Sequence, residues 1–202
     1  MLDARARKYF DRLFDQTASR FLAWGLRPNQ VTALALAVGL SAGLTLYLGW
    51  PLLAVALLWL SGFFDAVDGS MARQSKAASL TGALFDLVSD RVVELAIFWA
   101  LALLYPQCLY AMLGLLTAVL LSMTVFLTTG MLVERRSQKS FYYQAGLMER
   151  TEGFIASTLL ILLPQWLVPL VWLYAALIGI TILQRLAEAV KLLNEQEQEV
   201  QR

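Results

Sequence analysis

Four aspartates in one short part of the chain could together hold a divalent cation. They are Asp65, Asp68, Asp86 and Asp90, and on helices each of the two pairs, spaced three and four residues apart, would face one way. Converging carboxylates repel one another unless positive charge lies between them. Mg²⁺, Mn²⁺ and Ca²⁺ prefer oxygen ligands, and Mg²⁺ commonly binds a few carboxylates together with substrate phosphates. The pattern therefore predicts a cation site that also binds phosphate.

The residues around the aspartates suit the same chemistry. Gly69, Ala72 and Gly82 would let the backbone approach a bulky ligand closely, and Arg73 could pair with a phosphate or orient a carboxylate. Each of these residues alone has an ordinary explanation, such as helix packing for a glycine or membrane orientation for an arginine. Their combination beside apolar segments favours a functional site, because ionisable residues that border a membrane are functional candidates.

The composition indicates a membrane protein. Hydrophobic residues make up 59% of the 202 residues, charged residues only 15%, and the mean hydropathy is +0.63. A net charge of +1 argues against a nucleic-acid partner. The chain has no histidine, which excludes imidazole bases and histidine metal ligands, so proton transfer and metal binding fall mainly to carboxylates. The single cysteine excludes an internal disulfide.

The distribution of charge predicts six membrane spans. Residues 28–64, 95–133 and 153–184 contain no Asp, Glu, Lys or Arg. Each window is interrupted by a turn signal, namely Gly49-Trp50-Pro51, Tyr105-Pro106-Gln107 and Pro164-Gln165-Trp166. Because a spanning helix needs about 20 apolar residues, each window is expected to form a helical hairpin. The predicted fold is an all-α membrane protein with a single domain over residues 1–202, a bundle of three hairpins over 28–194 and a polar tail over 195–202.

The same distribution predicts the orientation. The three turns are uncharged, whereas all 16 Lys and Arg residues lie in segments on the other side of the predicted bundle. By the positive-inside rule that side is cytoplasmic, so we expect both termini and the aspartates there, in a multi-pass protein of the cytoplasmic (inner) membrane. A soluble helical bundle would need charged faces on most helices, and the windows lack them.

Residues 1–26 predict a separate amphipathic helix. Tyr9, Phe10, Leu13 and Phe14 recur at helical spacing, and basic residues such as Arg12 occupy other faces. This pattern is typical of a helix lying in the lipid headgroup region. A cytoplasmic helix packed on the bundle would show the same pattern, and both interpretations stay open. Charges continue to residue 27 before any apolar run, so a cleaved signal peptide is not expected.

The motif resembles the signature of a known enzyme family. Asp65-x2-Asp68-Gly69-x2-Ala72-Arg73-x8-Gly82-x3-Asp86-x3-Asp90 is similar, at every fixed position, to the signature of the CDP-alcohol phosphotransferases (CDP-alcohol phosphatidyltransferases). These membrane enzymes form headgroup linkages in phospholipid biosynthesis. Pro28-Asn29-Gln30-Val31-Thr32 also resembles the segment of this family at the start of its first span. The resemblance implies six transmembrane helices preceded by an interfacial helix, and a homodimer.

The resemblance also implies roles for individual residues. The metal ligands would be Asp65, Asp68 and Asp86, with Asp90 as a further ligand and as the general base. The cofactor would be Mg²⁺ or Mn²⁺, as two divalent cations. The CDP pocket would be formed by Asn29, Thr32, Asp65, Asp68, Gly69, Ala72, Arg73 and Gly82. A hydroxyl of a polar or phosphorylated alcohol would attack the donor, expected to be CDP-diacylglycerol, and CMP would leave.

The acceptor is less well defined by the sequence. The candidate acceptor-binding residues are Arg135, Arg136, Lys139 and Arg150, which could clamp a phosphate of glycerol 3-phosphate or another polyol phosphate. They could equally serve only to fix orientation in the membrane. The segment 146–153 resembles inositol-phosphate-transferring members of the family, where a second arginine follows Arg-x-Glu. Here that position is Gly153, which argues against a phosphorylated inositol.

Two other functions are compatible with clustered aspartates. An intramembrane prenyltransferase would normally need a second aspartate-rich motif, and no Asp follows Asp90. A divalent-cation transporter would favour acidic pairs near the midplane of broken helices, whereas these lie at a predicted boundary. Glu94, one turn beyond Asp90, could support the metal site or pair with Arg91 or Arg73.

Overall fold

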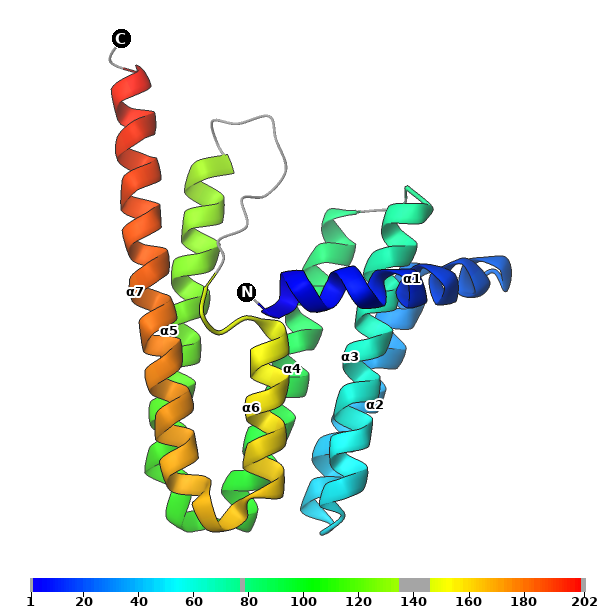
Figure 1. Cartoon of the computed structure of the whole chain (residues 1–202), viewed down its shortest axis with the longest axis vertical. Helices are drawn as coiled ribbons and strands as arrows, with labels where there is room; N and C mark the ends of the chain where they lie inside the picture. Colours follow the sequence, from blue (N-terminus) through cyan, green and yellow to red (C-terminus); the bar gives the residue numbers. More distant parts are fainter. Residues whose placement is uncertain (1, 77–78, 135–145, 201–202) are drawn as a thin grey trace.

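In the computed structural model, every regular element among the described residues is a helix. It describes the backbone of residues 2–76, 79–134 and 146–200, and the side chains of residues 11–76, 79–132 and 146–198. The helices are α1 (Leu2–Ala23), α2 (Pro28–Tyr47), α3 (Pro51–Gln74), α4 (Leu80–Leu104), α5 (Leu109–Glu134), α6 (Arg150–Leu162) and α7 (Leu167–Val200), with short 3₁₀ turns η1 (Pro106–Cys108) and η2 (Pro164–Trp166). Helices α2 to α7 run along one another, and α1 runs crosswise to them, over the side of the bundle that contains α3 (Figure 1).

The three predicted turns are confirmed as breaks between helices. α2 ends before Gly49, whose φ of +86° is a left-handed conformation that glycine adopts without strain, and α3 begins at Pro51. Pro106 and Pro164 begin η1 and η2, which connect α4 to α5 and α6 to α7. Proline suits these positions because the first turn of a helix does not use the N–H group that proline lacks.

Four helices are long and apolar enough to cross a membrane. They cover Pro28–Tyr47, Pro51–Gln74, Pro106–Leu132 and Pro164–Gln198, which makes the chain a multi-pass membrane protein. α4 has 25 residues, but its first half carries aspartates and other charged residues. α6 has 13 residues and is therefore about 20 Å long, shorter than the roughly 30 Å hydrocarbon core. The six-span arrangement thus stays a prediction, although α4 and α6 run beside the other helices (Figure 1).

α7 is the longest helix, with 34 residues, and it extends beyond the other helices (Figure 1). It runs without interruption through the boundary predicted at residue 194. In the part of residues 195–202 that the structure describes, the predicted polar tail is the helical end of α7.

The two helices that carry the motif, α3 and α4, both pack closely against α2. A Cβ atom added at Gly43 of α2 would lie 2.9 Å from the backbone oxygen of Ala96 in α4, so the glycine lets the two helices approach. The hydroxyl of Ser61 in α3 donates a hydrogen bond of 2.7 Å to the backbone oxygen of Ala35 in α2. These contacts hold α3 and α4 on either side of α2 and thereby fix where their aspartates lie.

α1 is fastened to the part of α3 that follows the first two aspartates. The Ser70 hydroxyl donates to the Asp15 carboxylate, and Gln74 Nε2 donates to the Asp15 backbone oxygen at 3.0 Å. A small apolar cluster joins α1, α2 and α3 through its buried members Ala18, Val31, Val67 and Met71. One face of α1 is therefore packed on protein, while its contact with lipid headgroups stays a prediction.

The close approach of α2 and α4 predicts an unequal effect of two matched substitutions. We expect Gly43→Ala to lower the free energy of unfolding by about 1–3 kcal/mol, because the new methyl group has to push α4 away. Gly179→Ala in α7, where an added Cβ meets no atom within 4 Å, should be neutral or slightly stabilising. Thermal unfolding in detergent measures both, and equal midpoints for the two variants would contradict this account of the packing.

Candidate active site

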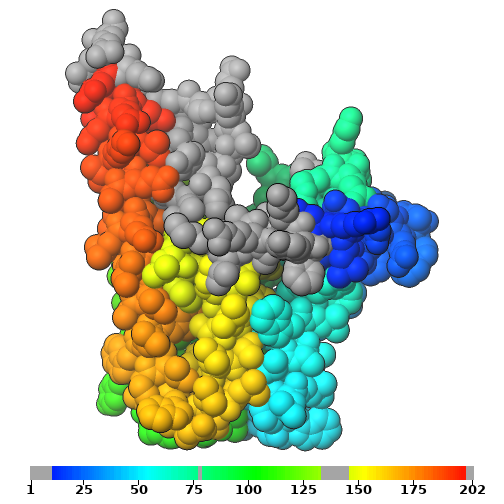
Figure 2. Space-filling model, viewed as in Figure 1, coloured from blue at the N-terminus to red at the C-terminus, as the bar shows by residue number. Residues whose placement is uncertain are grey.

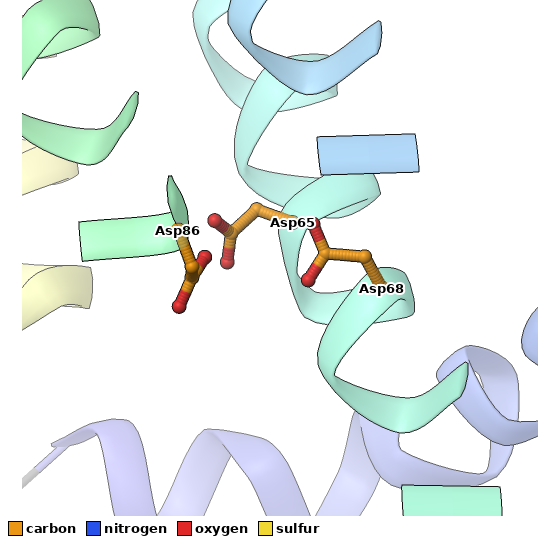
Figure 3. A group of neighbouring side chains, drawn as sticks. All are labelled: Asp65, Asp68 and Asp86. Atoms are coloured by element: carbon orange, nitrogen blue, oxygen red, sulfur yellow. The ribbon is translucent and has the colours of Figure 1, made fainter. Parts of the chain in front are cut away.

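Three of the four aspartates form one cluster between α3 and α4. Asp65, Asp68 and Asp86 each offer a carboxylate oxygen, and these three atoms all lie within 4.8 Å of one another. Asp65 and Asp68 come from α3 and are buried, whereas Asp86 comes from α4 and is partly buried. Figure 3 shows the three carboxylates directed toward a shared space. The aspartates of the two helices thus converge, as the sequence predicted.

The cluster suits a divalent cation. Asp68 Oδ2 and Asp86 Oδ1 are buried and have no hydrogen-bond partner among the described residues. A buried carboxylate oxygen without a partner is costly, since it has lost its water and gained nothing in exchange. A hard cation with oxygen ligands would satisfy both atoms and offset the repulsion among the three carboxylates. The donor set, oxygen only and without nitrogen or sulfur, favours Mg²⁺ or Mn²⁺ over zinc.

Asp90 lies beside this cluster and is held by an arginine from α6. Arg150 forms ion pairs with Asp65 and with Asp90 Oδ1, the latter at a distance of 2.8 Å from Nη2. The side chain therefore links α6 to both α3 and α4. Figure 2 shows why this is possible, because α6 lies between α7 and α3 on this face of the molecule.

The position of Arg150 was only partly foreseen. The sequence suggested it as a residue for the acceptor, a role that stays a prediction, and the structure shows that it pairs with two of the predicted metal-site aspartates. No local pattern could have shown this pairing, because Arg150 is 60 residues beyond Asp90 in the chain. Whether Asp90 is also a metal ligand stays a prediction, since the described three-residue cluster does not include it.

The start of α2 lies against both motif helices. The Thr32 side chain lies near the Asp68 carboxylate, and its hydroxyl donates a hydrogen bond of 3.2 Å to the Pro28 backbone oxygen. Asn29 Oδ1 lies 3.1 Å from the point where a Cβ atom of Gly82 would stand, so the first turns of α2 and α4 are neighbours. Ser79 caps α4 by accepting a hydrogen bond of 3.0 Å from the Gly82 backbone N–H. Asn29 and Thr32 thus adjoin the motif, and their binding of the nucleotide stays a prediction.

The remaining predicted nucleotide residues lie on the last turns of α3. The only neighbour that a Cβ atom at Gly69 would meet within 4 Å is Arg73 Nη1, at 3.5 Å, so little of the described protein covers this glycine. Arg73 is exposed and Ala72 is partly buried. This arrangement leaves backbone accessible beside Asp68, but binding of CDP there stays a prediction.

A cavity of about 170 Å³ opens on the other side of Asp90 and Arg150. Its polar lining includes Asp90, Arg91, Glu94, Glu149, Arg150, Tyr174 and Arg185, together with three serines. Glu94 pairs with Arg91, which was one of the two sequence interpretations of this residue. The predicted acceptor residues Arg135, Arg136 and Lys139 lie outside the described residues.

Sequence reasoning missed the buried arginine of this cavity. Arg185 in α7 donates to the Ser122 hydroxyl at 3.2 Å and lies 5.0 Å from the centre of the Phe126 ring. A signal was available, because Arg185 directly follows the third uncharged window and continues an apolar helix. An ionisable residue in that place is a functional candidate.

Comparison with known proteins identifies the family. The family model described as CDP-alcohol phosphatidyltransferase matches residues 26–185, a range that contains all four aspartates. The protein belongs to this family. The CDP-alcohol phosphatidyltransferase match begins just before α2 and ends in α7, so it spans the helices that build the site.

Several relatives of this CDP-alcohol phosphatidyltransferase are similar over most of their length. Phosphatidylinositol phosphate synthase of Corynebacterium glutamicum is 29% identical over 199 residues, covering 95% of this chain and 90% of that protein. Inner membrane protein YnjF of Escherichia coli is 29% identical over 170 residues, covering 80% of this chain and 82% of that protein.

Solved structures show the same fold. Phosphatidylinositol phosphate synthase of Mycobacterium tuberculosis with CDP-DAG bound has a TM-score of 0.68 at 26% identity, covering 88% of this chain and 94% of that chain. The complex of the same protein with manganese and citrate has a TM-score of 0.67 at 26% identity, covering 87% of this chain and 88% of that chain.

The carboxylate cluster predicts metal binding that depends on each aspartate. We expect Asp86→Asn to weaken Mn²⁺ binding by about 10- to 100-fold, because the buried site loses a charged ligand. Asp11→Asn, which makes the same change on the exposed face of α1, should bind Mn²⁺ like the wild type. Titration of free Mn²⁺ followed by electron paramagnetic resonance measures both affinities. Equal affinity in the two variants would rule out the cluster as the metal site.

Proposed function

We propose that this CDP-alcohol phosphatidyltransferase moves a phosphatidyl group from CDP-diacylglycerol to an acceptor hydroxyl and releases CMP, as a step of phospholipid biosynthesis. The observation that carries the proposal is the cluster of Asp65, Asp68 and Asp86, with unpartnered buried oxygens, directly beside Asp90. The M. tuberculosis relative has been solved with CDP-DAG and, separately, with manganese, which supports the same donor and the same kind of cofactor here.

The donor would be held by cation and backbone together. Asp65, Asp68 and Asp86 would hold Mg²⁺ or Mn²⁺, and the oxygens of Asp90 allow a second ion. When bound, the cation neutralises the diphosphate and stabilises the leaving phosphate. The cytidine diphosphate would lie over Gly69 and between Asn29, Thr32, Ala72 and Gly82, where the glycines allow close approach, and Arg73 would pair with phosphate.

Asp90 would act as the general base. An oxygen of the acceptor attacks the phosphorus that carries the diacylglycerol group, and its proton passes to the Asp90 carboxylate. The bond from that phosphorus to the bridging oxygen breaks, and CMP leaves with this oxygen. Arg150 orients Asp90 through its ion pair. Proton transfer to a positioned carboxylate can contribute a factor of roughly 10² to 10⁴.

The acceptor would enter from the cavity on the far side of Asp90. We propose a polyol or polyol phosphate, with glycerol 3-phosphate as one candidate, because arginine side chains line this cavity. Arg135, Arg136 and Lys139 precede Arg150 in the chain and would add to phosphate binding. Membership of the family decides against the alternatives of a prenyltransferase and a cation transporter.

We further propose that the site faces the cytoplasm. All six helices α2 to α7 would span the inner membrane as three hairpins, α1 would lie in the headgroup region, and two copies would pair through their membrane helices. Arg27 precedes α2, whereas the η1 and η2 turns contain no Lys or Arg, as expected for the opposite side.

The single buried cysteine permits a direct test of this orientation. In a Cys108→Ser background, one cysteine is placed at Gln165, which is exposed in η2, or at Gln198, which is exposed near the end of α7. A membrane-impermeant maleimide applied to spheroplasts should label position 165 and not position 198, and both should label after lysis. Labelling of position 198 in intact spheroplasts would refute a cytoplasmic C-terminus.

The function is tested by CMP release. Purified protein with Mn²⁺ or Mg²⁺ and CDP-diacylglycerol should release CMP when a suitable polyol or polyol phosphate is added, and a chelator should abolish this release. Asp90→Asn should lower the turnover rate by at least about 10²-fold while CDP-diacylglycerol still binds, because the base is lost and the pocket is kept. Glu195→Gln, an exposed carboxylate in α7, serves as the control.

Two results would count against the proposal. If no acceptor supports CMP release by the wild type, the reaction class is wrong for this chain. If Asp90→Asn turns over at the wild-type rate, another group takes the proton and the assignment of the base fails.

A further inference from the structure

One wall of the cavity beside Asp90 is built from residues of α4 and α7. The Tyr174 hydroxyl donates a hydrogen bond of 3.3 Å to Glu94 Oε1, and Arg91 pairs with Glu94 Oε2. Tyr174, Glu94 and Arg91 all line the cavity that Asp90 and Arg150 also line. The wall therefore faces the same space as the proposed base, although none of its three members belongs to the aspartate motif.

Gly153 makes the position of the tyrosine hydroxyl possible. A Cβ atom added at Gly153 would lie 3.1 Å from Tyr174 Oη, which is tighter than an ordinary van der Waals contact. The Tyr174 ring is buried and packs edge-on against Phe98, with 6.3 Å between ring centres, so it has little freedom to move away. A larger side chain at position 153 would thus displace the hydroxyl from Glu94.

The wall has unused hydrogen-bonding capacity. A carboxylate can accept about four hydrogen bonds, and the contacts of Glu94 with Tyr174 and Arg91 use one position on each oxygen. Arg91 Nε is buried and has no hydrogen-bond partner in the described part of the chain. Groups of this kind are costly to leave unpaired, so an occupant of the cavity with both donors and acceptors would be favoured.

The charges of the wall indicate what kind of molecule would bind in the cavity. Because Arg91 already compensates the charge of Glu94, the wall gives no strong preference to a cationic amine. Hydroxyl groups both donate and accept, and therefore match the carboxylate and the guanidinium at once. Ser61, Ser122 and Ser157 add further hydroxyls to the lining. The cavity of about 170 Å³ suits a small molecule rather than a second lipid.

We propose that Glu94 and Tyr174 are specificity-determining residues that bind the non-reacting hydroxyl groups of a polyol acceptor. Glu94 is one helical turn beyond Asp90, about 6 Å along the axis of α4. A small polyol can therefore present one hydroxyl to Asp90 while another reaches Glu94. The polyol is either neutral or phosphorylated, and the wall recognises its hydroxyls in both cases. This inference rests on the proposed transfer reaction.

The test compares acceptors and separates binding from turnover. CMP release from CDP-diacylglycerol is measured with glycerol, inositol, their monophosphates, serine and ethanolamine. We expect transfer to a polyol or its phosphate and not to the amino alcohols, and comparison of each polyol with its phosphate identifies which form is used. Glu94→Gln and Tyr174→Phe should each raise the acceptor KM by roughly 3- to 10-fold, with kcat and the KM for CDP-diacylglycerol little changed.

Two further variants sharpen the result. Gly153→Ala should raise the acceptor KM in the same direction, because its methyl group displaces the Tyr174 hydroxyl. Glu195→Gln makes the same chemical change as Glu94→Gln at an exposed position and should leave all constants unchanged. Glu94→Gln could fail to fold after losing its pairing with Arg91. In that case the acceptor KM of Tyr174→Phe still tests the inference, because this variant keeps the packing of the ring.

The outcomes distinguish a failure of this inference from a failure of the proposed transfer reaction. If the wild type releases CMP but Tyr174→Phe keeps the wild-type acceptor KM, the inference is overturned and the transfer reaction stands. Efficient transfer to serine or ethanolamine would likewise overturn the polyol assignment alone. Absence of CMP release with every acceptor overturns the proposed function and this inference together.

Discussion

The repulsion among aspartates buried between α3 and α4 is the constraint on which this structure depends. Asp65, Asp68 and Asp86 bring like charges within 4.8 Å of one another, and Asp90 adjoins them. Such a group can stay ionised and together only if positive charge is supplied and the helices cannot separate. Arg150 supplies part of the charge, and a divalent cation is suited to supply the rest. The apolar packing of α2 against both helices resists their separation.

Elements distant in the sequence therefore serve the same few carboxylates. α1 is fastened to α3 through Asp15 and Ser70, two residues beyond Asp68. α6 contributes Arg150, and α7 contributes Tyr174 to the cavity beyond Asp90. In the proposed reaction the donor side and the acceptor side of the site would meet at Asp90, as an in-line transfer between two substrates needs.

The sequence predicted those features that depend on interactions between residues close together in the chain. Helical spacing predicted the convergence of Asp65 and Asp68 with Asp86, and proline and glycine predicted the three turns, because backbone sterics act over a few residues. The pairing of Arg150 with Asp65 and the contact of Tyr174 with Glu94 were not predictable, since they join residues far apart in the chain. The span prediction for α4 is unconfirmed for a related reason, because the carboxylates that build the site also make this helix less apolar.

If α4 spans the bilayer, as proposed, its charged half has a consequence for how the protein enters the membrane. On insertion scales a charged residue at the centre of a helix costs about 2.5–3.5 kcal/mol, so α4 alone would be a poor substrate for the translocon. The hairpin of α2 and α3 precedes α4 during synthesis, and the surface around Gly43 is shaped to receive it. Biogenesis would then be sequential, with the first hairpin acting as an intramolecular chaperone that shelters the polar face of the arriving helix from lipid.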